Sequence, residues 1–187
     1  MTESTRERLL AAAVARAAQG GISAASLRQI ATDLGTSHRM LIYHFGSKEG
    51  LLVAVVQEVE RRQRETFTQI DVAGATASEA MRRMWRRLAH PSLWPHERLF
   101  FEMYGQALQG RPGTEALLEG IIDSWVETGT AMAIQMGIPA EVARAQARLG
   151  VAVIRGLLLD LLATGDRAGV DAALEQFIAM SEAAYLS

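Results

Sequence analysis

A short segment near the N-terminus concentrates side chains that can donate hydrogen bonds to a nucleic acid. It holds His38, Arg39, Tyr43, His44 and Lys48, the last being the only lysine of the chain. A guanidinium group can donate two parallel hydrogen bonds to guanine in the major groove, and imidazole, phenol and ammonium groups can donate to phosphate oxygens. These residue types, gathered in one place, predict a surface that reads DNA.

The spacing within this segment suits one helix with two different faces. At about 100° per residue, Leu41 and Phe45 fall within roughly 40° of each other and define an inward face. Arg39 and Tyr43 lie on the opposite side. Lys48 stands at the start of the next helix, where its ammonium group and the free backbone N–H groups both favour a phosphate. We therefore expect Arg39 and Tyr43 to face outward.

Helix start and stop signals surround the segment and define the elements that position it. The expected N-cap residues are Ser4, Ser26, Ser37 and Ser47, and the expected capping-box partners are Glu7 and Gln29. Gly20, Gly21 and Gly35 supply the stops. Two short helices separated by a tight glycine-containing turn, with a further helix on each side, make a helix-turn-helix unit.

The rest of the chain reads as further helices, because alternating strand patterns are missing. The expected helices span residues 47–70, 78–90, 96–109, 114–136, 139–164 and 167–185. Their boundary signals are Ser78 with Glu79, Pro95, Gly110 with Pro112, Gly137 with Pro139, and Gly165. The predicted fold class is therefore all-α, with about nine helices.

Residues around the glycine turn also carry a family resemblance. They are Gly35, Thr36, Ser37, Leu41, His44, Phe45, Ser47 and Lys48, preceded by Ile30 and Ala31 and followed by Leu51 and Leu52. This pattern, within residues 5–52, resembles the N-terminal signature of the tetracycline repressor (TetR) family. One position departs from it, since the family usually has Tyr directly after the recognition-helix Leu, where this chain has Ile42 and then Tyr43.

The resemblance implies a three-helix DNA-binding domain over residues 1–46 and a helical effector-binding and dimerisation domain over residues 47–187. The partner it implies for the first domain is a double-stranded DNA operator. The expected DNA-binding residues are Arg28, Thr36, Ser37, His38, Arg39, Tyr43, His44 and Lys48. The alternative for His44, next to Phe45, is a half-buried histidine whose hydrogen bonds are satisfied within the protein.

Aromatic and methionine residues recur in the middle of the chain at helical spacing. Such a stripe can be ordinary core, or it can be the wall of a cavity for a flat or apolar ligand. The family resemblance favours the second alternative, because TetR-type regulators commonly bind an effector in this region. The expected effector is apolar or aromatic, and the expected lining residues are Trp85, Leu88, Phe101, Tyr104, Trp125 and Met132.

The two C-terminal helices have the pattern of an interface. Residues 149–165 are apolar almost all round, which indicates burial on more than one side. With residues 170–186 they resemble the helices through which family members form homodimers, giving a four-helix bundle. Arg155 and Asp160 lie about 140° apart on their helix, so we expect them not to pair with each other. A structural ion pair across the dimer or a ligand contact would explain them.

These expectations combine into a regulatory mechanism. A two-fold dimer presents two reading helices to a pseudo-palindromic operator. An effector that binds better when those helices are wrongly spaced lowers the affinity for the operator. Repression relieved by a small molecule is the expected mode, with activation as the alternative, and the hinge is expected on the helix that begins at Ser47.

Other classes of function have less support in the sequence. The chain has no Cys and none of the common hydrolase, metalloprotease or phosphate-loop motifs, so we expect no enzyme activity and no cofactor. His90 and His96 lack a third ligand, so we expect no metal site. A helical ligand-binding or protein-interaction module without DNA binding is the remaining alternative.

Composition and charge place few further limits on function. Residues 1–50 hold six Lys and Arg against four Asp and Glu, whereas residues 51–187 hold thirteen against seventeen, so charge alone does not identify a polyanionic partner. No signal peptide or membrane-spanning segment is evident. We therefore expect a cytoplasmic protein without a membrane partner. The ratio of eighteen Arg to one Lys suggests a bacterium with GC-rich DNA.

Overall fold

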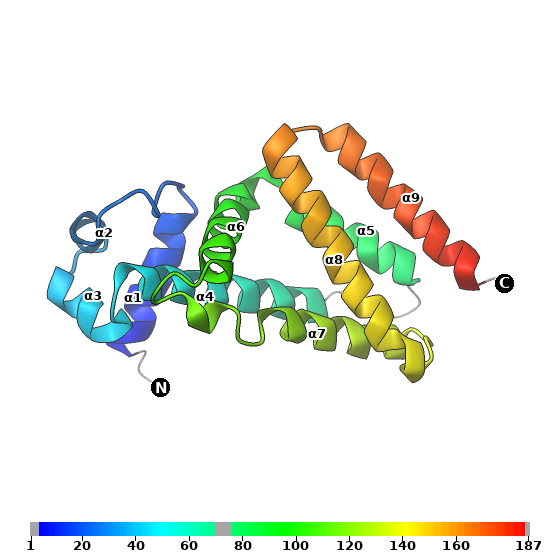
Figure 1. Cartoon of the computed structure of the whole chain (residues 1–187), viewed down its shortest axis with the longest axis horizontal. Coiled ribbons are helices and arrows are strands. Elements are labelled where there is room, and N and C mark those ends of the chain that lie inside the picture. Colours follow the sequence, from blue (N-terminus) through cyan, green and yellow to red (C-terminus); the bar gives the residue numbers. More distant parts are fainter. Residues whose placement is uncertain (1–3, 70–75, 186–187) are drawn as a thin grey trace. The chain divides into compact units, whose positions relative to one another are not determined.

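The computed structural model describes residues 4–69 and 76–185, and every regular element within these ranges is helical (Figure 1). The α-helices are α1 (Thr5–Ala17), α2 (Leu27–Asp33), α3 (His38–Phe45), α4 (Lys48–Thr68), α5 (Ala77–Leu88), α6 (Trp94–Leu108), α7 (Ile121–Gln135), α8 (Ala140–Thr164) and α9 (Arg167–Tyr185). Two short 3₁₀ helices are η1 (Pro91–Leu93) and η2 (Glu115–Leu117). The all-α prediction is confirmed. Over the described ranges, no helix is both long and apolar enough to cross a membrane.

The described residues form two compact units. The first holds residues 4–63 and 92–121, and the second holds residues 64–69, 76–91 and 122–185. Helix α4 contributes its longer N-terminal part to the first unit and its C-terminal end to the second. Compactness therefore groups α6 with α1–α3. The sequence predicts a DNA-binding domain up to residue 46 and an effector-binding domain after it. That division is one of function and not of compactness, and it stays a prediction.

Local capping explains where the first helices begin. Ser4 Oγ accepts the backbone N–H of Glu7 at 3.2 Å, and the Glu7 carboxylate accepts the N–H of Ser4 at 2.7 Å. Ser26 and Ser37 accept from the third residue of α2 and α3 respectively. Each cap satisfies an N–H group that has no partner inside its helix. The start signals predicted at these three serines are confirmed.

Three predicted helix boundaries were wrong, and the simplest is the start of α6, which begins at Trp94 instead of residue 96. Helix α5 is capped by Thr76 rather than Ser78, because Thr76 and Glu79 form a reciprocal capping box whose spacing is present in the sequence. The helix predicted over residues 114–136 is interrupted, since η2 is followed by Gly120 with a φ of 70° before α7 begins. A left-handed residue cannot continue a right-handed α-helix.

The first unit is built around the contacts of α1, α2, α3, α4 and α6. Buried side chains with almost no exposed surface come from α1, α2, α3, α4 and α6, and include Ala13, Ile30, Leu41, Val55 and Met103. A small polar group is buried with them: Gln63 Nε2 donates to Glu97 Oε1 at 2.8 Å. His96 on α6 shares a 3.2 Å hydrogen bond with the carbonyl of Val14 on α1. These contacts fix α6 against α1 and α4.

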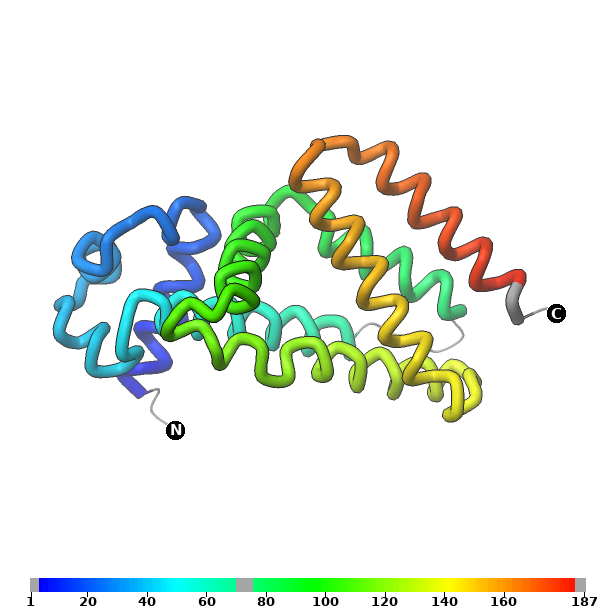
Figure 2. The backbone as a smooth tube through the Cα atoms, viewed as in Figure 1, coloured from blue at the N-terminus to red at the C-terminus, as the bar shows by residue number. Residues whose placement is uncertain are grey.

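The second unit packs α8 and α9 as an antiparallel pair (Figure 2). Their buried faces carry Ile154, Leu158, Leu161, Val170, Leu174 and Ile178. Gly165 ends α8 in the left-handed conformation, with a φ of 73°, where a side chain would be strained. Helix α5 joins α9 through the Arg82–Glu175 ion pair at 2.7 Å. This arrangement buries one face of each helix of the pair.

Candidate nucleic-acid interface

Helix α3 presents the polar face that the sequence predicts. Leu41 is fully buried, whereas Tyr43 is 79% exposed and Arg39 and His38 are also exposed. The Ser37 hydroxyl caps the helix by accepting the N–H of Met40. The prediction that Arg39 and Tyr43 lie on the outer side of this helix is confirmed. Contact of either residue with DNA remains a prediction.

The turn between α2 and α3 is fixed by backbone hydrogen bonds. Gly35 has a φ of 64°, and its N–H donates to the carbonyl of Thr32 at 3.1 Å. The N–H of Thr36 donates to the carbonyl of Ala31 at 2.9 Å, and Thr36 is half-buried. Thr36 is therefore partly withdrawn from solvent, while Arg28 on α2 is exposed.

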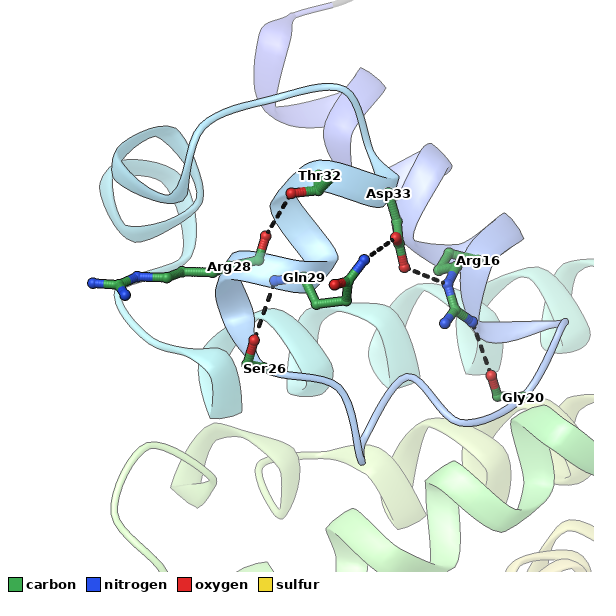
Figure 3. Close-up of polar contacts among 7 residues, drawn as sticks. All are labelled: Arg16, Gly20, Ser26, Arg28, Gln29, Thr32 and Asp33. Atoms are coloured by element: carbon green, nitrogen blue, oxygen red, sulfur yellow. Dashed lines mark hydrogen bonds and ion pairs between the residues drawn. The ribbon is translucent and has the colours of Figure 1, made fainter.

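A polar network joins α1 to α2 and holds the unit that carries α3 (Figure 3). Arg16 Nε donates to Asp33 Oδ2 at 2.9 Å, and Arg16 Nη1 donates to the carbonyl of Gly20 at 2.8 Å. Gln29 Nε2 donates to Asp33 Oδ1 at 2.8 Å. These hydrogen bonds, chiefly the one from Arg16, lower the pKa of Asp33. The Arg28 side chain extends away from this network, in a direction that leaves its guanidinium group accessible.

Sequence reasoning missed this network. Gln29 and Asp33 are four residues apart on one helix, a spacing at which side chains meet, so that part carried a signal. Arg16 and Asp33 lie on different helices, and their contact depends on how α1 packs against α2. The network fixes α1 against α2, the helix that precedes α3.

The Lys48 ammonium group makes one hydrogen bond within the protein. It donates to the backbone carbonyl of Ser23, and the residue is half-buried at the first position of α4. An ammonium group has three N–H donors, so this bond leaves donors for a phosphate. Ser47 Oγ accepts the N–H of Gly50 at 2.9 Å, as its predicted N-cap role requires. Lys48 thus ties the loop before α2 to the start of α4.

His44 is half-buried, but the described part of the structure does not show the satisfied hydrogen bonds of the alternative structural role. Its Nε2 atom is buried and has no hydrogen-bond partner among the described residues. Its ring packs edge-on against Tyr43 at 4.9 Å and lies 6.3 Å from the ring of Phe45, over which the Arg6 guanidinium sits at 5.3 Å. The Nε2 atom is therefore withdrawn from solvent. The predicted DNA contact of His44 is untested.

The structure brings two predicted effector-binding residues into one cluster. Trp125 and Met132 on α7 are buried with Phe67 from the end of α4, and the Phe67 and Trp125 rings lie 6.1 Å apart. Met84, Met136 and Val151 pack against this cluster. Trp85 and Leu88 on α5 are also buried, and the Trp85 indole N–H donates to Asp171. These four residues lie in the second unit.

The other two predicted effector-binding residues lie on α6 in the first unit. Phe101 and Tyr104 are half-buried and both pack against Phe100, at ring distances of 5.2 Å and 5.4 Å. A role for any of the six residues in effector binding remains a prediction. Within the described ranges, no group of three or more His, Cys, Asp or Glu side chains is arranged to hold a metal ion.

Comparisons with known proteins agree with this geometry. Residues 9–55 match the family model described as bacterial regulatory proteins, tetR family. A segment of 73 residues is 33% identical to the HTH-type transcriptional repressor NicS of Pseudomonas putida, covering 38% of this chain and 34% of that protein. The matched segment therefore spans about a third of that relative's length.

Solved structures share the fold over nearly the whole chain. A TetR transcriptional regulator from Legionella pneumophila aligns with a TM-score of 0.71 at 22% identity, covering 96% of this chain and 98% of that one. The multidrug binding protein EbrR, solved in complex with proflavin, aligns with a TM-score of 0.64 at 24% identity, covering 92% of this chain and 96% of that one. The N-terminal segment, residues 9–55, is therefore similar in sequence to the tetR family of bacterial regulatory proteins, and the chain as a whole shares its fold with these solved structures.

Proposed function

We propose that the protein is a transcriptional repressor that binds a pseudo-palindromic operator as a homodimer and leaves it when a small-molecule effector binds. The observation that carries the proposal is the outer face of α3, where Arg39 and Tyr43 are exposed beside a fully buried Leu41. A helix held rigidly by its inner face can enter the major groove with its outer face. The relative NicS is named as a repressor.

Within this proposal the predicted residues divide into two groups. Arg39 reads a guanine, because its guanidinium can donate to the O6 and N7 atoms together. Tyr43, Lys48 and the N-terminal end of α3 position the protein on phosphates, which carry no sequence information. Arg28 on α2 is exposed and adds a further phosphate contact.

Dimerisation through α8 and α9 is supported by the apolar side chains these helices expose. Leu149 and Leu159 on α8 and Met180 on α9 are 54%, 52% and 62% exposed. Small residues on the exposed sides, such as Gly156 and Ala172, permit close approach of a second helix pair. A stable interface buries on the order of 1,000 Å² or more, which two helices from each protomer can supply. Four helices then form the bundle.

The charged residues of α8 fit the same dimer. Asp160 is exposed and Arg155 is half-buried, so neither is sealed in the core of a single protomer. In the proposed dimer both approach the interface, where an ion pair between protomers would offset the cost of removing them from water.

The proposed effector is flat and apolar or aromatic. Trp125, Met132 and Phe67 form a buried cluster with further Met side chains around it, and Met side chains adapt to ligands of different shape. EbrR, which has a similar fold, was solved with proflavin. Proflavin is a flat aromatic compound, so a ligand of that shape suits the Trp and Met side chains here.

Helix α4 provides the link between effector and DNA in this proposal. It begins at Lys48, beside the predicted phosphate contacts, and its far end carries Phe67 in the Trp125 cluster. A displacement of Phe67 by an effector therefore acts on the same continuous helix that begins at Lys48. An effector that favours the displaced state lowers operator affinity by the same coupling factor.

Selection of bound fragments from a pool of genomic DNA tests the proposal. The purified protein should enrich a pseudo-palindromic sequence, and a labelled duplex of that sequence should shift in a gel at nanomolar protein concentration. If no sequence is enriched and all duplexes bind equally weakly, the proposal is wrong. The alternative, a ligand-binding module that does not read DNA, would then hold.

A further inference from the structure

A groove in the first unit is lined by none of the predicted DNA-binding or effector-binding residues. Its volume is about 440 Å³, within the range of about 300–1,000 Å³ typical of small-molecule sites. One side is the end of α1 and the following loop, including Gln19 and Ser23. The other side is α6, including Leu99 and the charged residues Arg98 and Glu102.

Arg98 is exposed and makes no ion pair within the described part of the chain. Its guanidinium lies over the Trp94 ring, 5.6 Å from the ring centre. That contact leaves its N–H donors available, because a cation–π contact uses the face of the guanidinium group rather than its edge. Arg167 makes a useful contrast, since its Nε donates to Asp171, four residues further along its helix, at 2.8 Å.

Glu102 lies one helical turn after Arg98, and its side chain is also exposed. Residues four apart on a helix have Cβ atoms about 5–6 Å apart, a spacing at which opposite charges commonly pair. Glu102 instead accepts a single long hydrogen bond, from Gln106 Nε2 at 3.3 Å. The groove therefore presents a separate donor group and a separate acceptor group on one wall, with Leu99 between them in sequence.

We propose that this groove binds a small zwitterion, with its carboxylate on Arg98 and its ammonium group on Glu102. A guanidinium edge matches a carboxylate with two parallel hydrogen bonds, and a carboxylate accepts from an ammonium group. Pro95, which is half-buried, supplies apolar surface that can contact the carbon chain between the two charges. A ligand with only one of the two charges leaves either Arg98 or Glu102 without a counter-ion.

The loop that forms one wall gives the groove a route to the DNA-binding surface. Ser23 lines the groove, and its backbone carbonyl accepts the hydrogen bond from Lys48 at the start of α4. A ligand that shifts this loop therefore alters the position of Lys48. This second part rests on the proposed function, because it requires that Lys48 contact DNA.

Isothermal titration calorimetry with the full-length protein tests the binding part. The probe is 4-aminobutyrate, and butyrate and butylamine are matched compounds with one charge each. We expect saturable binding of 4-aminobutyrate, weaker by about tenfold or more for either single-charge compound and for R98Q or E102Q. Thermal unfolding of both variants checks that they fold.

Two control variants change the same residue types elsewhere. Arg86 on α5 and Glu127 on α7 are exposed and lie outside the groove, so R86Q and E127Q should bind 4-aminobutyrate as the unaltered protein does. Absence of binding at millimolar 4-aminobutyrate, equal binding of butyrate, or undiminished binding by folded R98Q and E102Q would each overturn the proposal.

The coupling part is measured separately with a selected DNA fragment. Saturating 4-aminobutyrate should change the Kd for that fragment by about threefold or more, and R98Q should abolish the change. If the protein binds both 4-aminobutyrate and the DNA fragment, and neither changes the affinity for the other, the coupling is overturned. The proposed zwitterion site then still stands. Failure to bind any DNA fragment, with calorimetric binding intact, would reject the proposed function and not the zwitterion site.

Discussion

The indole N–H of Trp85 donates a hydrogen bond to the carboxylate of Asp171, which joins α5 to α9. Arg167 reinforces the contact, because its Nε donates to both Asp171 oxygens at 2.8 Å and its guanidinium lies 5.8 Å from the Trp85 ring centre. The polar end of Trp85 is therefore satisfied by the protein. An effector that contacts Trp85 would use the ring and not the N–H group.

Replacing Trp85 by Phe separates the contribution of the aromatic ring from that of the indole N–H group. The variant keeps a buried aromatic ring and loses the donor to Asp171, so we expect the free energy of unfolding to fall by about 1–3 kcal/mol, partly from the lost hydrogen bond and partly from the smaller ring. Urea denaturation followed by circular dichroism measures the change. An unaltered midpoint would show that the hydrogen bond contributes little to stability.

Glu58 makes part of the stability dependent on pH. Hydrogen bonds from Arg61, and to a smaller extent from Arg62, lower the pKa of its carboxyl group from 4.5 to about 2. Burial of the carboxyl group acts in the opposite direction and raises this pKa. Because the folded pKa is depressed, this contribution is present above about pH 4.5 and is lost as the pH falls toward 2.

Glu58→Gln should therefore lower the free energy of unfolding at pH 7 by about 1–3 kcal/mol, the lower end applying where solvent screens the two ion pairs. The difference between variant and unaltered protein should disappear as the pH approaches 2. Urea titrations from pH 7 downward measure it, with Glu127→Gln as the control at an exposed residue. A difference that stays constant over that range would exclude the ionised carboxylate as its cause.

Arg39→Ala tests direct reading of a base. If Arg39 contacts a guanine, the loss should weaken binding to the selected sequence by about 1–3 kcal/mol and leave binding to scrambled DNA nearly unchanged. Fluorescence anisotropy with both duplexes measures the two affinities. Equal losses on both duplexes would reassign Arg39 to a phosphate.

Lys48→Ala should change the salt dependence of DNA binding. Removal of one phosphate contact per protomer should reduce the slope of log K against log salt concentration by about one unit per subunit. The same variant loses the hydrogen bond to Ser23, so its thermal unfolding must be measured alongside. A folded variant with an unchanged slope would place Lys48 outside the interface.

Charge on the exposed faces of α8 and α9 should dissociate the proposed dimer. Leu159→Glu and Met180→Glu introduce carboxylates at side chains that are exposed in one protomer, so folding should be retained. Sedimentation velocity at micromolar concentration should show a dimer for the unaltered protein and monomers for both variants. Ile134→Glu on α7 is the matched control, and monomeric unaltered protein would contradict the interface.

Local signals in the sequence predicted the features that depend on neighbouring residues. The caps at Ser4, Ser26 and Ser37 need only a residue three positions away, and the outer face of α3 follows from helical spacing. Thr76 carried the same kind of signal, but Ser78 competed with it, and only the folded chain distinguishes them.

Contacts between distant residues could not be predicted in this way. Lys48 meets Ser23, and Arg16 meets Asp33, only because the helices pack at particular angles. The aromatic residues expected to line one effector site illustrate the same limit. Helical spacing gives a stripe on each helix, whereas the contact of Trp125 with Phe67 depends on the packing of α7 against the end of α4.

The continuity of α4 restricts how the length of this chain can change. Each residue added to an α-helix turns everything beyond it by about 100° and advances it by about 1.5 Å. A single insertion between Arg64 and Phe67 would therefore turn Phe67 away from Trp125, its partner within the second unit. An insertion of about a whole turn there would keep Phe67 on the side of the helix that faces Trp125.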